Sequence, residues 1–392
     1  MANKSIYKPV ILIGNGCRRN PALVEYLCSL GIPVLTTWMA IDLVPEDSPV
    51  FCGRPGGIGQ RAANIIQQKA DALYVYGARL DEQQVYFDYD GFAPLAQIHV
   101  FDVDENELQK LPKRWFVKRV QDLNTWNDFS SGVEEQPDPD WLSWCKALYA
   151  RFRPELDGEE TKKFIDPFYF NRLLSEYAQP DDILAMGSSG GAPCSFLQAF
   201  KIKKGQIFTN CSTLGHMGAD IPMAIGACIG GGNRRTLCAT GDGGFMLNIQ
   251  ELEVIRRLSL PIKFFVFDNN GYGSIRNMQN ARFDGRKVAC DPDSGLTLPR
   301  IPEIGADYGG VADAFGIHSG TAKNSAELRA FFESTWWTNE QPYILVLKVD
   351  PEWAQWPKVV NRLVDGAFVK TPMQDMTPPI DDLEELMRWG DD

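Results

Sequence analysis

The stretch Thr240–Tyr272, TGDGGFMLNIQELEVIRRLSLPIKFFVFDNNGY, decides the fold of this chain. A strand over 235–239 leads into a glycine-rich turn, an amphipathic helix, a second strand over 263–267 and a polar turn. The helix is predicted to bury a face of four residues spaced three apart, Ile249, Leu252, Ile255 and Leu258. The second strand is β-branched and aromatic, as in strands buried on both faces. The stretch therefore predicts a βαβ unit, with both polar turns at the carboxyl edge of a parallel sheet, where open α/β folds bind ligands.

The two turns carry complementary chemistry. Gly241-Asp242-Gly243-Gly244 places a carboxylate in a loop whose bare backbone can approach a phosphate, and the helix behind it adds free N–H groups and a positive dipole end. Asp268-Asn269-Asn270-Gly271 offers amide and carbonyl oxygens. Mg²⁺ suits one carboxylate, a few neutral oxygens and two phosphate oxygens.

The spacing of the two turns indicates which ligand they would bind. Asp242 and Asn269 are 27 positions apart, which is enough for one helix and one strand. GDG followed at this distance by a double Asn is the fingerprint of thiamine diphosphate (ThDP). An ordinary pair of βαβ turns without a ligand is the alternative, and the register of the second turn favours the cofactor.

Length and composition set the outer bounds. A chain of 392 residues is expected to form two domains, and its hydrophobic share of 44% is enough for a substantial core. The net charge of −12 argues against nucleic acid or an anionic membrane as partner. The N-terminus lacks an apolar signal core, and no apolar run approaches ~18 residues. The nine scattered cysteines are expected to be reduced thiols in a cytoplasmic protein.

Residues 9 to about 120 alternate strand and helix, which predicts a Rossmann-like open sheet. Gly14-Asn15-Gly16 follows a strand over 10–13, and a glycine cluster over 53–59 precedes a helix over 62–69. Either glycine group could hold a nucleotide phosphate. Neither completes GxGxxG, however, so tight turns are the favoured interpretation.

The predicted organisation has four parts. They are a first domain over 1–125, a linker over 126–165, a second domain over 166–350 and a C-terminal arm over 351–392. The linker is polar and contains proline, with one short helix over 141–151 whose tryptophans are expected to pack against a neighbouring domain. The predicted fold class is therefore α/β, with two Rossmann-like open parallel-sheet domains.

The second domain carries two further motifs. A strand over 182–186 ends in Gly187-Ser188-Ser189-Gly190-Gly191, a second candidate phosphate cradle. Leu214-Gly215-His216-Met217-Gly218-Ala219 then enters a helix rich in small residues, which indicates close contact with the sheet or with another subunit.

At this point the chain resembles the acetolactate (acetohydroxyacid) synthase branch of the ThDP-dependent enzymes. The matching stretches cover most of the chain: GRPGGIGQRAANIIQQKADALYVYGARLD, FAPLAQIHVFDVDENELQK, LGHMGADIPMAIGA, GDGGFMLNIQELEVI and DNNGYGSIRNMQ. Such enzymes have a pyrimidine-binding, a middle and a diphosphate-binding domain. This chain resembles the middle and diphosphate-binding domains only.

The resemblance implies a role for each matching residue. Asp242, the Asn269 side chain and the Gly271 carbonyl would hold Mg²⁺. Met217 would wedge between the two rings of ThDP, and His216 beside it would face the substrate; these two are the candidate catalytic residues. The remaining candidate cofactor contacts are Gly187, Ser188, Ser189, Gly190, Gly215, Gly241, Gly243, Gly244 and Tyr272.

Catalysis in this family also needs a glutamate from the pyrimidine-binding domain, which activates the thiazolium through the aminopyrimidine. The sequence is expected to lack a segment that supplies it. The resemblance therefore implies a split enzyme, in which a partner subunit carries the glutamate, the cofactor binds at the interface and the assembly is a hetero-oligomer built on a dimer.

Two departures from the family concern ligands. The synthases have Met and Trp in the acceptor pocket where this chain has Ser274 and Met278, which predicts a larger or more polar acceptor, such as a sugar-derived carbonyl. The first domain resembles one that holds FAD in true synthases, with Arg79 and Asp102 near the matching stretches. FAD is therefore a possible second cofactor, although many relatives have lost it.

Three functions remain open from the sequence. The first is a carboligase, a transferase that decarboxylates a 2-oxo acid and adds the product to a second carbonyl. The second is a decarboxylase or lyase that protonates the same intermediate. The third is a catalytically silent, partner-binding subunit, against which the retention of Asp242, Asn269 and Met217 weighs.

Overall fold

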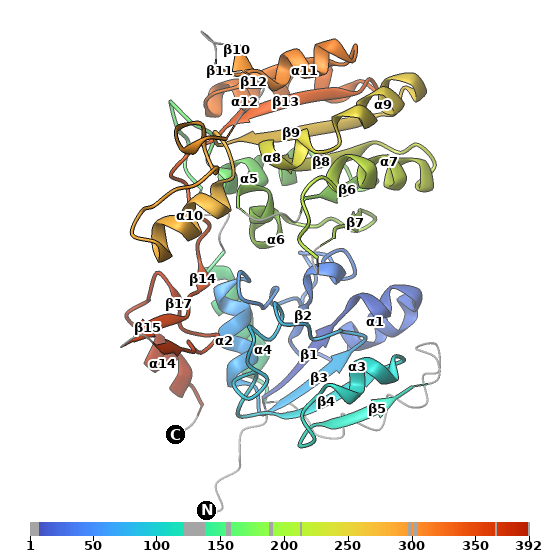
Figure 1. Cartoon of the computed structure of the whole chain (residues 1–392). Helices are drawn as coiled ribbons and strands as arrows, with labels where there is room; N and C mark the ends of the chain where they lie inside the picture. The colour runs from blue at the N-terminus through green and yellow to red at the C-terminus, as the bar shows by residue number, and fades with distance from the viewer. Residues whose placement is uncertain are drawn as a thin grey trace, which may run out of the picture. The chain divides into compact units, whose positions relative to one another are not determined.

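The computed structural model describes residues 8–120, 138–153, 158–187, 191–211, 214–296, 300–301, 305–364 and 367–390. The chain forms two compact units, one of Met1–Pro154 with Trp356–Asp392 and the other of Glu155–Gln355 (Figure 1). Each unit contains an open parallel sheet with helices packed on it. The predicted α/β class with two parallel-sheet domains is confirmed.

The sheet of the first unit has the strand order β2-β1-β3-β4-β5, with every neighbouring pair parallel. Its central strands consist of buried apolar residues, as the sequence predicts for strands covered on both faces. The elements are β1 (Pro9–Ile13), α1 (Pro21–Ser29), β2 (Val34–Thr36), α2 (Arg61–Lys69), β3 (Ala72–Tyr76), β4 (Gln97–Asp102), α3 (Glu105–Gln109) and β5 (Phe116–Arg119).

Two segments from outside the predicted first domain pack into this unit. Helix α4 (Trp141–Arg151) buries Trp141, whose Nε1 donates to the Pro9 carbonyl at 2.9 Å. The ring of Trp389, near the C-terminus, stacks on Trp144 with centroids 5.0 Å apart. Apolar burial thus draws the helix expected in the linker, and the chain after Gln355, onto the first unit.

The glycine N–H groups in the turns of the first unit donate hydrogen bonds to acceptors within the same unit. Gly14 N donates to the Tyr76 carbonyl at 2.8 Å, and Gly16 N to the Gly77 carbonyl at 2.9 Å. A Cβ on Gly14 would lie 2.2 Å from Gly77 O, so only glycine fits there. In the 53–59 cluster, Gly56 N donates to Asn64 Oδ1 at 2.9 Å. These contacts support the interpretation of both groups as tight turns.

The sheet of the second unit has the order β12-β13-β9-β8-β6-β7, also parallel throughout. Strand β9 is buried along its whole length, and its side chains alternate between the two faces of the sheet. Phe264 and Val266 join a core with helices α7, α9 and α11. Phe265 and Phe267 contact aromatic rings on the other face, including Phe170 of α5.

The second unit contains the predicted strands at both turns together with further helices and strands. They are α5 (Pro167–Tyr177), β6 (Ile183–Met186), α6 (Ser195–Ala199), β7 (Ile207–Thr209), α7 (Asp220–Gly230), β8 (Thr236–Gly241), α8 (Asp242–Met246), α9 (Leu252–Leu258), β9 (Ile262–Asp268), α10 (Gly273–Arg282), β10 (Arg300–Ile301), β11 (Gly305–Ala306), α11 (Tyr308–Ala314), β12 (His318–Ala322), α12 (Ser325–Phe332), α13 (Thr335–Thr338) and β13 (Tyr343–Lys348). The chain then adds β14 (Lys358–Val359), β15 (Arg362–Val364), β16 (Ala367–Val369), β17 (Met376–Thr377) and α14 (Leu383–Arg388) to the first unit.

The prediction of one amphipathic helix after the GDGG turn is wrong in detail. The helix is interrupted after α8, and Asn248 leaves the helical conformation with φ −137° and donates its side-chain amide to the Gly218 carbonyl at 2.6 Å. A 3₁₀ turn over Ile249–Glu251 and then α9 follow. Leu252 and Ile255 are buried as predicted, whereas Leu258 is 47% exposed because the helix ends there.

Two further expectations concern the whole chain. None of the nine cysteines, all of which are described, forms a disulfide; seven are buried and two half-buried, as expected for small apolar core residues. Within the described ranges, no helix has the length and apolar character needed to cross a bilayer.

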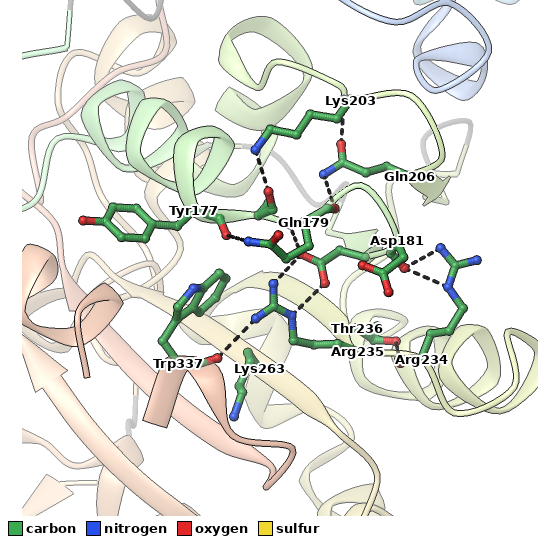
Figure 2. A network of polar contacts seen from close by, with 12 residues as sticks. Tyr177, Gln179, Asp181, Lys203, Gln206, Arg234, Arg235, Thr236, Lys263 and Trp337 are labelled. Atoms are coloured by element: carbon green, nitrogen blue, oxygen red, sulfur yellow. Dashed lines mark hydrogen bonds and ion pairs between the residues drawn. The ribbon is translucent and has the colours of Figure 1, made fainter. Parts of the chain in front are cut away.

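A buried polar network lies at the amino-terminal ends of β8 and β9 (Figure 2). The Arg235 guanidinium donates to both carboxylate oxygens of Asp182 at 2.7 Å and lies 4.4 Å from the centre of the Trp337 ring. Lys263 is fully buried beside it and donates to Asn339 Oδ1 and the Gln341 carbonyl. Burial, with the charge of Arg235 as a smaller cause, lowers the pKa of Lys263 to about 8.

Lys263 should make stability depend on pH. Its pKa is lower in the folded chain than the ordinary 10.5, so the unfolded chain binds this proton more tightly and the contribution of Lys263 to stability rises as pH rises from about 8 to 10.5. Lys263→Met removes this rise. Between about pH 7 and pH 10, the free energy of unfolding measured in urea should rise by on the order of 2 kcal/mol more in the wild type than in Lys263→Met. The exposed-site control Lys204→Met should show the same pH dependence of stability as the wild type. The same pH dependence in Lys263→Met would contradict the assignment.

Candidate active site

The two predicted turns meet at the carboxyl edge of the second sheet. Strands β8 and β9 are parallel neighbours, and Gly241 at the end of β8 lies opposite Phe267 in β9. The Asp242 carboxylate then joins the turns, because Oδ1 accepts from Gly243 N at 2.7 Å and Oδ2 accepts from Gly271 N at 2.9 Å. One buried side chain therefore fixes the distance between the two loops.

Asp242 is a strained place for a negative charge. It is 3% exposed, and burial, followed by the nearby charge of Asp268, raises the pKa of Asp242 to about 7. The two backbone N–H groups and the charge of Arg276 act in the opposite direction. A divalent cation would offset the cost of this buried carboxylate far more strongly than these groups do.

The second turn presents an oxygen without a donor. Asn269 Oδ1 is buried, and no described residue donates a hydrogen bond to it. A buried amide oxygen without a partner is costly, and a cation is the simplest group that would satisfy it. Asn270 and Gly271 adopt φ values of +62° and +128°, which turn the chain sharply at this point. Asp242, Asn269 and the Gly271 carbonyl therefore fit a magnesium ion.

This oxygen set differs from a cluster of charged ligands. Among the residues that the structure describes, no group of three or more His, Cys, Asp or Glu side chains could hold a metal ion. A site with one carboxylate and neutral oxygens is incomplete by itself for Mg²⁺, which prefers six oxygens. Its remaining ligands would come from phosphate and water.

A pocket of about 260 Å³ opens beside the two turns. Most of the predicted cofactor residues line it. The lining residues are Gly191, Ala192, Pro193, Gly215, Met217, Gly241, Asp242, Gly243, Gly244, Phe267, Asn269, Gly271, Tyr272, Gly273, Ser274 and Ile275. The chain thus provides a glycine-bordered pocket with the cation oxygens in its wall.

Glycine at position 243 is required by space. A Cβ there would lie 2.4 Å from Tyr272 Cε1 and 2.8 Å from Met217 Cε. Gly243 therefore leaves room between the predicted wedge residue and the ring of Tyr272, and its backbone faces the pocket. The approach of this backbone to a phosphate group, which the GDGG motif predicts, stays a prediction.

Other residues predicted to contact the cofactor or the substrate are not among those that line the pocket. His216 is exposed and is not among the residues that line the pocket, so no contact in the structure supports its expected role toward the substrate. Gly187 is buried at the end of β6, where its N–H donates to the Ala239 carbonyl at 2.7 Å. Ser188, Ser189 and Gly190 lie outside the described residues.

One of the two residues predicted for the acceptor pocket lines the pocket, and the two residues near the predicted flavin site belong to the first unit. Ser274 lines the pocket, whereas Met278 is 39% exposed further along α10. In the first unit, Arg79 is exposed and pairs with Glu107 at 3.1 Å. Asp102 accepts from Asp104 N at 3.0 Å, and burial raises its pKa. The contacts of Arg79 and Asp102 lie within their own unit and give no indication of a flavin.

Several site residues carry no recognisable signal in the sequence. Pro193 and Ile275 line the pocket, Arg276 is buried behind the second turn, and the Tyr308 hydroxyl is buried near Asp242 without a hydrogen-bond partner among the described residues. Pro193 and Ile275 could have been suggested only by their closeness in the sequence to the glycine motifs. Arg276 and Tyr308 reach the site through packing, which the sequence does not reveal.

The fold and the pocket define a class of protein. A glycine-rich loop and a carboxylate–amide pair at the carboxyl edge of a parallel sheet suit a diphosphate held through a divalent cation. Family models agree with this class. Residues 188–347 match the C-terminal TPP binding domain of thiamine pyrophosphate enzymes, and residues 4–124 match their central domain. The chain belongs to the thiamine pyrophosphate enzymes.

The chain is also similar to curated acetolactate synthases. It is 30% identical over 359 residues to the acetolactate synthase isozyme 2 large subunit of Escherichia coli, covering 90% of this chain and 62% of that protein. It is 29% identical to the large subunit of Corynebacterium glutamicum, covering 90% and 56%. The probable large subunit of Methanocaldococcus jannaschii is likewise 29% identical, covering 88% and 58%. The chain thus spans about three-fifths of the length of these relatives.

Asp242→Ala should abolish magnesium-dependent ThDP binding. The change removes the carboxylate that bridges the turns, and we expect the ThDP affinity measured calorimetrically with Mg²⁺ to fall by at least about 100-fold. The ligand-free unfolding midpoint should change little, because the loss of a buried charge offsets the lost hydrogen bonds. The exposed-site control Asp293→Asn should bind as the wild type does. Undiminished ThDP binding by Asp242→Ala would refute the site.

Gly243→Ala tests the space in the pocket. The added methyl group would clash with Tyr272 and Met217, and overpacking of about 1–3 kcal/mol corresponds to a roughly 10-fold or greater loss of ThDP affinity. Gly226→Ala in α7 is the matched control, because a Cβ there meets no atom within 4 Å. Equal ThDP affinities of the two variants would show that the pocket does not receive the cofactor.

Proposed function

We propose that this chain is the diphosphate-binding subunit of a ThDP- and Mg²⁺-dependent carboligase that acts on 2-oxo acids. The observation that carries the proposal is the pairing at the two turns, where Asp242 is fixed between Gly243 N and Gly271 N while Asn269 Oδ1 is buried without a donor. The similarity to acetolactate synthase large subunits supports the reaction class.

The chain's own residues would bind and orient the cofactor. Asp242, the Asn269 side chain and the Gly271 carbonyl would hold Mg²⁺, and the backbone at Gly243 and Gly244 would contact the diphosphate. When bound, ThDP would supply the nucleophilic carbon and the electron sink that decarboxylation of a 2-oxo acid requires.

Two residues of the pocket lining, Met217 and Gly215, would contact the rings of the cofactor. The start of α7 beside them is fixed by Asp220, whose carboxylate accepts from Thr240 Oγ1 at 2.5 Å. Met217 would support the bent form of ThDP, and the Gly215 carbonyl would accept a hydrogen bond from the aminopyrimidine. A rigid helix start keeps both groups in place during turnover.

The activating glutamate would come from a separate pyrimidine-binding chain. Among the described residues that line the pocket, Asp242 is the one carboxylate, and it already accepts two backbone hydrogen bonds. The cofactor would then bind between two polypeptides in a hetero-oligomer. A glutamate supplied within a longer form of the same polypeptide is the arrangement that the experiment must distinguish.

The pocket wall favours coupling to a second carbonyl. Ser274 lines the pocket at the start of α10, where the synthases have a bulkier residue, and Gly273 beside it carries no side chain. An open and partly polar wall suits an acceptor larger or more polar than pyruvate. The choice between coupling and simple protonation depends on whether such an acceptor can enter.

The proposal is tested by product analysis. The chain is purified alone and with proteins that co-purify with it, then supplied with pyruvate, ThDP and Mg²⁺, with and without an aldehyde such as glyceraldehyde. We expect turnover only with a partner chain and a carbon–carbon coupled product when the aldehyde is present. Release of acetaldehyde alone would indicate a decarboxylase, and turnover by a longer single polypeptide would contradict the separate partner. Absence of ThDP binding under every condition would overturn the proposed function.

A further inference from the structure

Arg276 lies directly behind the second turn of the candidate site. It occupies the first part of α10 and is only 2% exposed. Its Nη2 donates to the Asn269 carbonyl at 3.0 Å, and Nη1 lies 3.5 Å from the Asn270 carbonyl oxygen, at the limit of a hydrogen bond. The guanidinium thus contacts two successive carbonyls of the turn that carries the Asn269 amide.

The same guanidinium reaches a second segment of the chain. Arg276 Nη2 also donates to the Pro351 carbonyl, in the segment that follows β13. That segment is packed within the second unit, because the Trp353 ring meets Phe168 edge-on at 5.8 Å and Gln355 donates to Gln198 at 2.8 Å. Arg276 therefore ties the turn to a fixed part of the unit.

The charge of Arg276 has no direct counter-ion. In the part of the chain that the structure describes, Arg276 forms no ion pair, although its charge acts on the nearby Asp242 and Asp291, and its Nε is buried without an acceptor. Burying a cation against neutral carbonyls is costly, so packing alone would be served better by an apolar side chain. The planar fork of arginine, however, can grip several carbonyls at once.

The geometry of the turn explains what this grip achieves. Asn270 has φ +62°, a left-handed conformation that costs a residue with a side chain, whereas Gly271 adopts φ +128° as glycine readily does. Arg276 contacts the carbonyls of Asn269 and Asn270. The Asn269 side-chain oxygen then has no donor among the described residues, and the Gly271 carbonyl, which accepts one hydrogen bond from Gly273 N at 3.0 Å, keeps a second lone pair for a cation.

We propose that Arg276 is a positioning residue for the magnesium site, a role that rests on the proposed function. By holding the Asn269 and Asn270 carbonyls, it directs the Asn269 amide oxygen and the Gly271 carbonyl toward the cation. It acts through the turn and touches neither the cation nor the substrate. Loss of Arg276 should therefore weaken the dependence of ThDP binding on Mg²⁺ before it alters the fold.

Asn277 provides a matched control on the same helix. Its side-chain amide donates to the Trp353 carbonyl at 3.3 Å, so it contacts the same segment as Arg276 without reaching the turn. Asn277→Ala removes an anchor of α10 and leaves the turn contacts intact. A purely structural role of Arg276 would make the two positions behave alike.

The test measures the Mg²⁺ concentration that half-saturates ThDP binding to the full chain, by titration calorimetry. We expect Arg276→Met to raise this concentration at least 10-fold, Arg276→Lys to raise it about 3-fold because an ammonium group grips fewer carbonyls, and Asn277→Ala to leave it within 2-fold. The electron paramagnetic resonance spectrum of Mn²⁺ bound in place of Mg²⁺ should change in the Arg276 variants alone.

Each outcome decides the proposal. If Arg276→Met fails to fold, Arg276→Lys supplies the comparison, and thermal unfolding without ligands reports the state of each variant. Half-saturation and Mn²⁺ spectra equal to the wild type in Arg276→Lys, or shifted equally in Asn277→Ala, would overturn the positioning role. A wild-type chain that binds no ThDP would instead overturn the proposed function.

Discussion

The Asp242 carboxylate is the interaction on which the candidate site depends. It accepts backbone hydrogen bonds from its own turn and from the neighbouring turn, and so fixes two loops that leave adjacent strands. A carboxylate buried to this degree is costly without a cation, and its raised pKa expresses that cost. A cation bound beside Asp242 would remove this cost.

The charged groups near Asp242 lie outside the pocket lining. Asp268 pairs with Lys348 at the end of the next strand, and Arg276 lies behind the second turn against backbone carbonyls. Neither group lines the pocket. This arrangement leaves the pocket wall with few charges of its own, so that the cation and the diphosphate would dominate the local field.

The sequence was sufficient for the fold class and for the meeting of the two turns, because hydrophobic strands and glycine motifs are local signals. It could not reveal that α4 and the chain after Gln355 pack on the first unit, since this depends on the buried Trp141 and the partly buried Trp389 packing against residues distant in the sequence. The break after α8 was missed because the side-chain contact of Asn248 with Gly218 is not local. Arg276 was missed for the same reason, as its partners include Pro351.

The most direct measurement of the central claim is a crystal structure of the chain with ThDP and Mn²⁺, recorded with anomalous scattering. A bridging metal predicts one anomalous peak within coordination distance of Asp242, Asn269 Oδ1 and the Gly271 carbonyl, with the diphosphate completing the coordination. Bound ThDP with the metal peak elsewhere, or a pocket closed by the side chains of Met217 and Tyr272, would contradict the account.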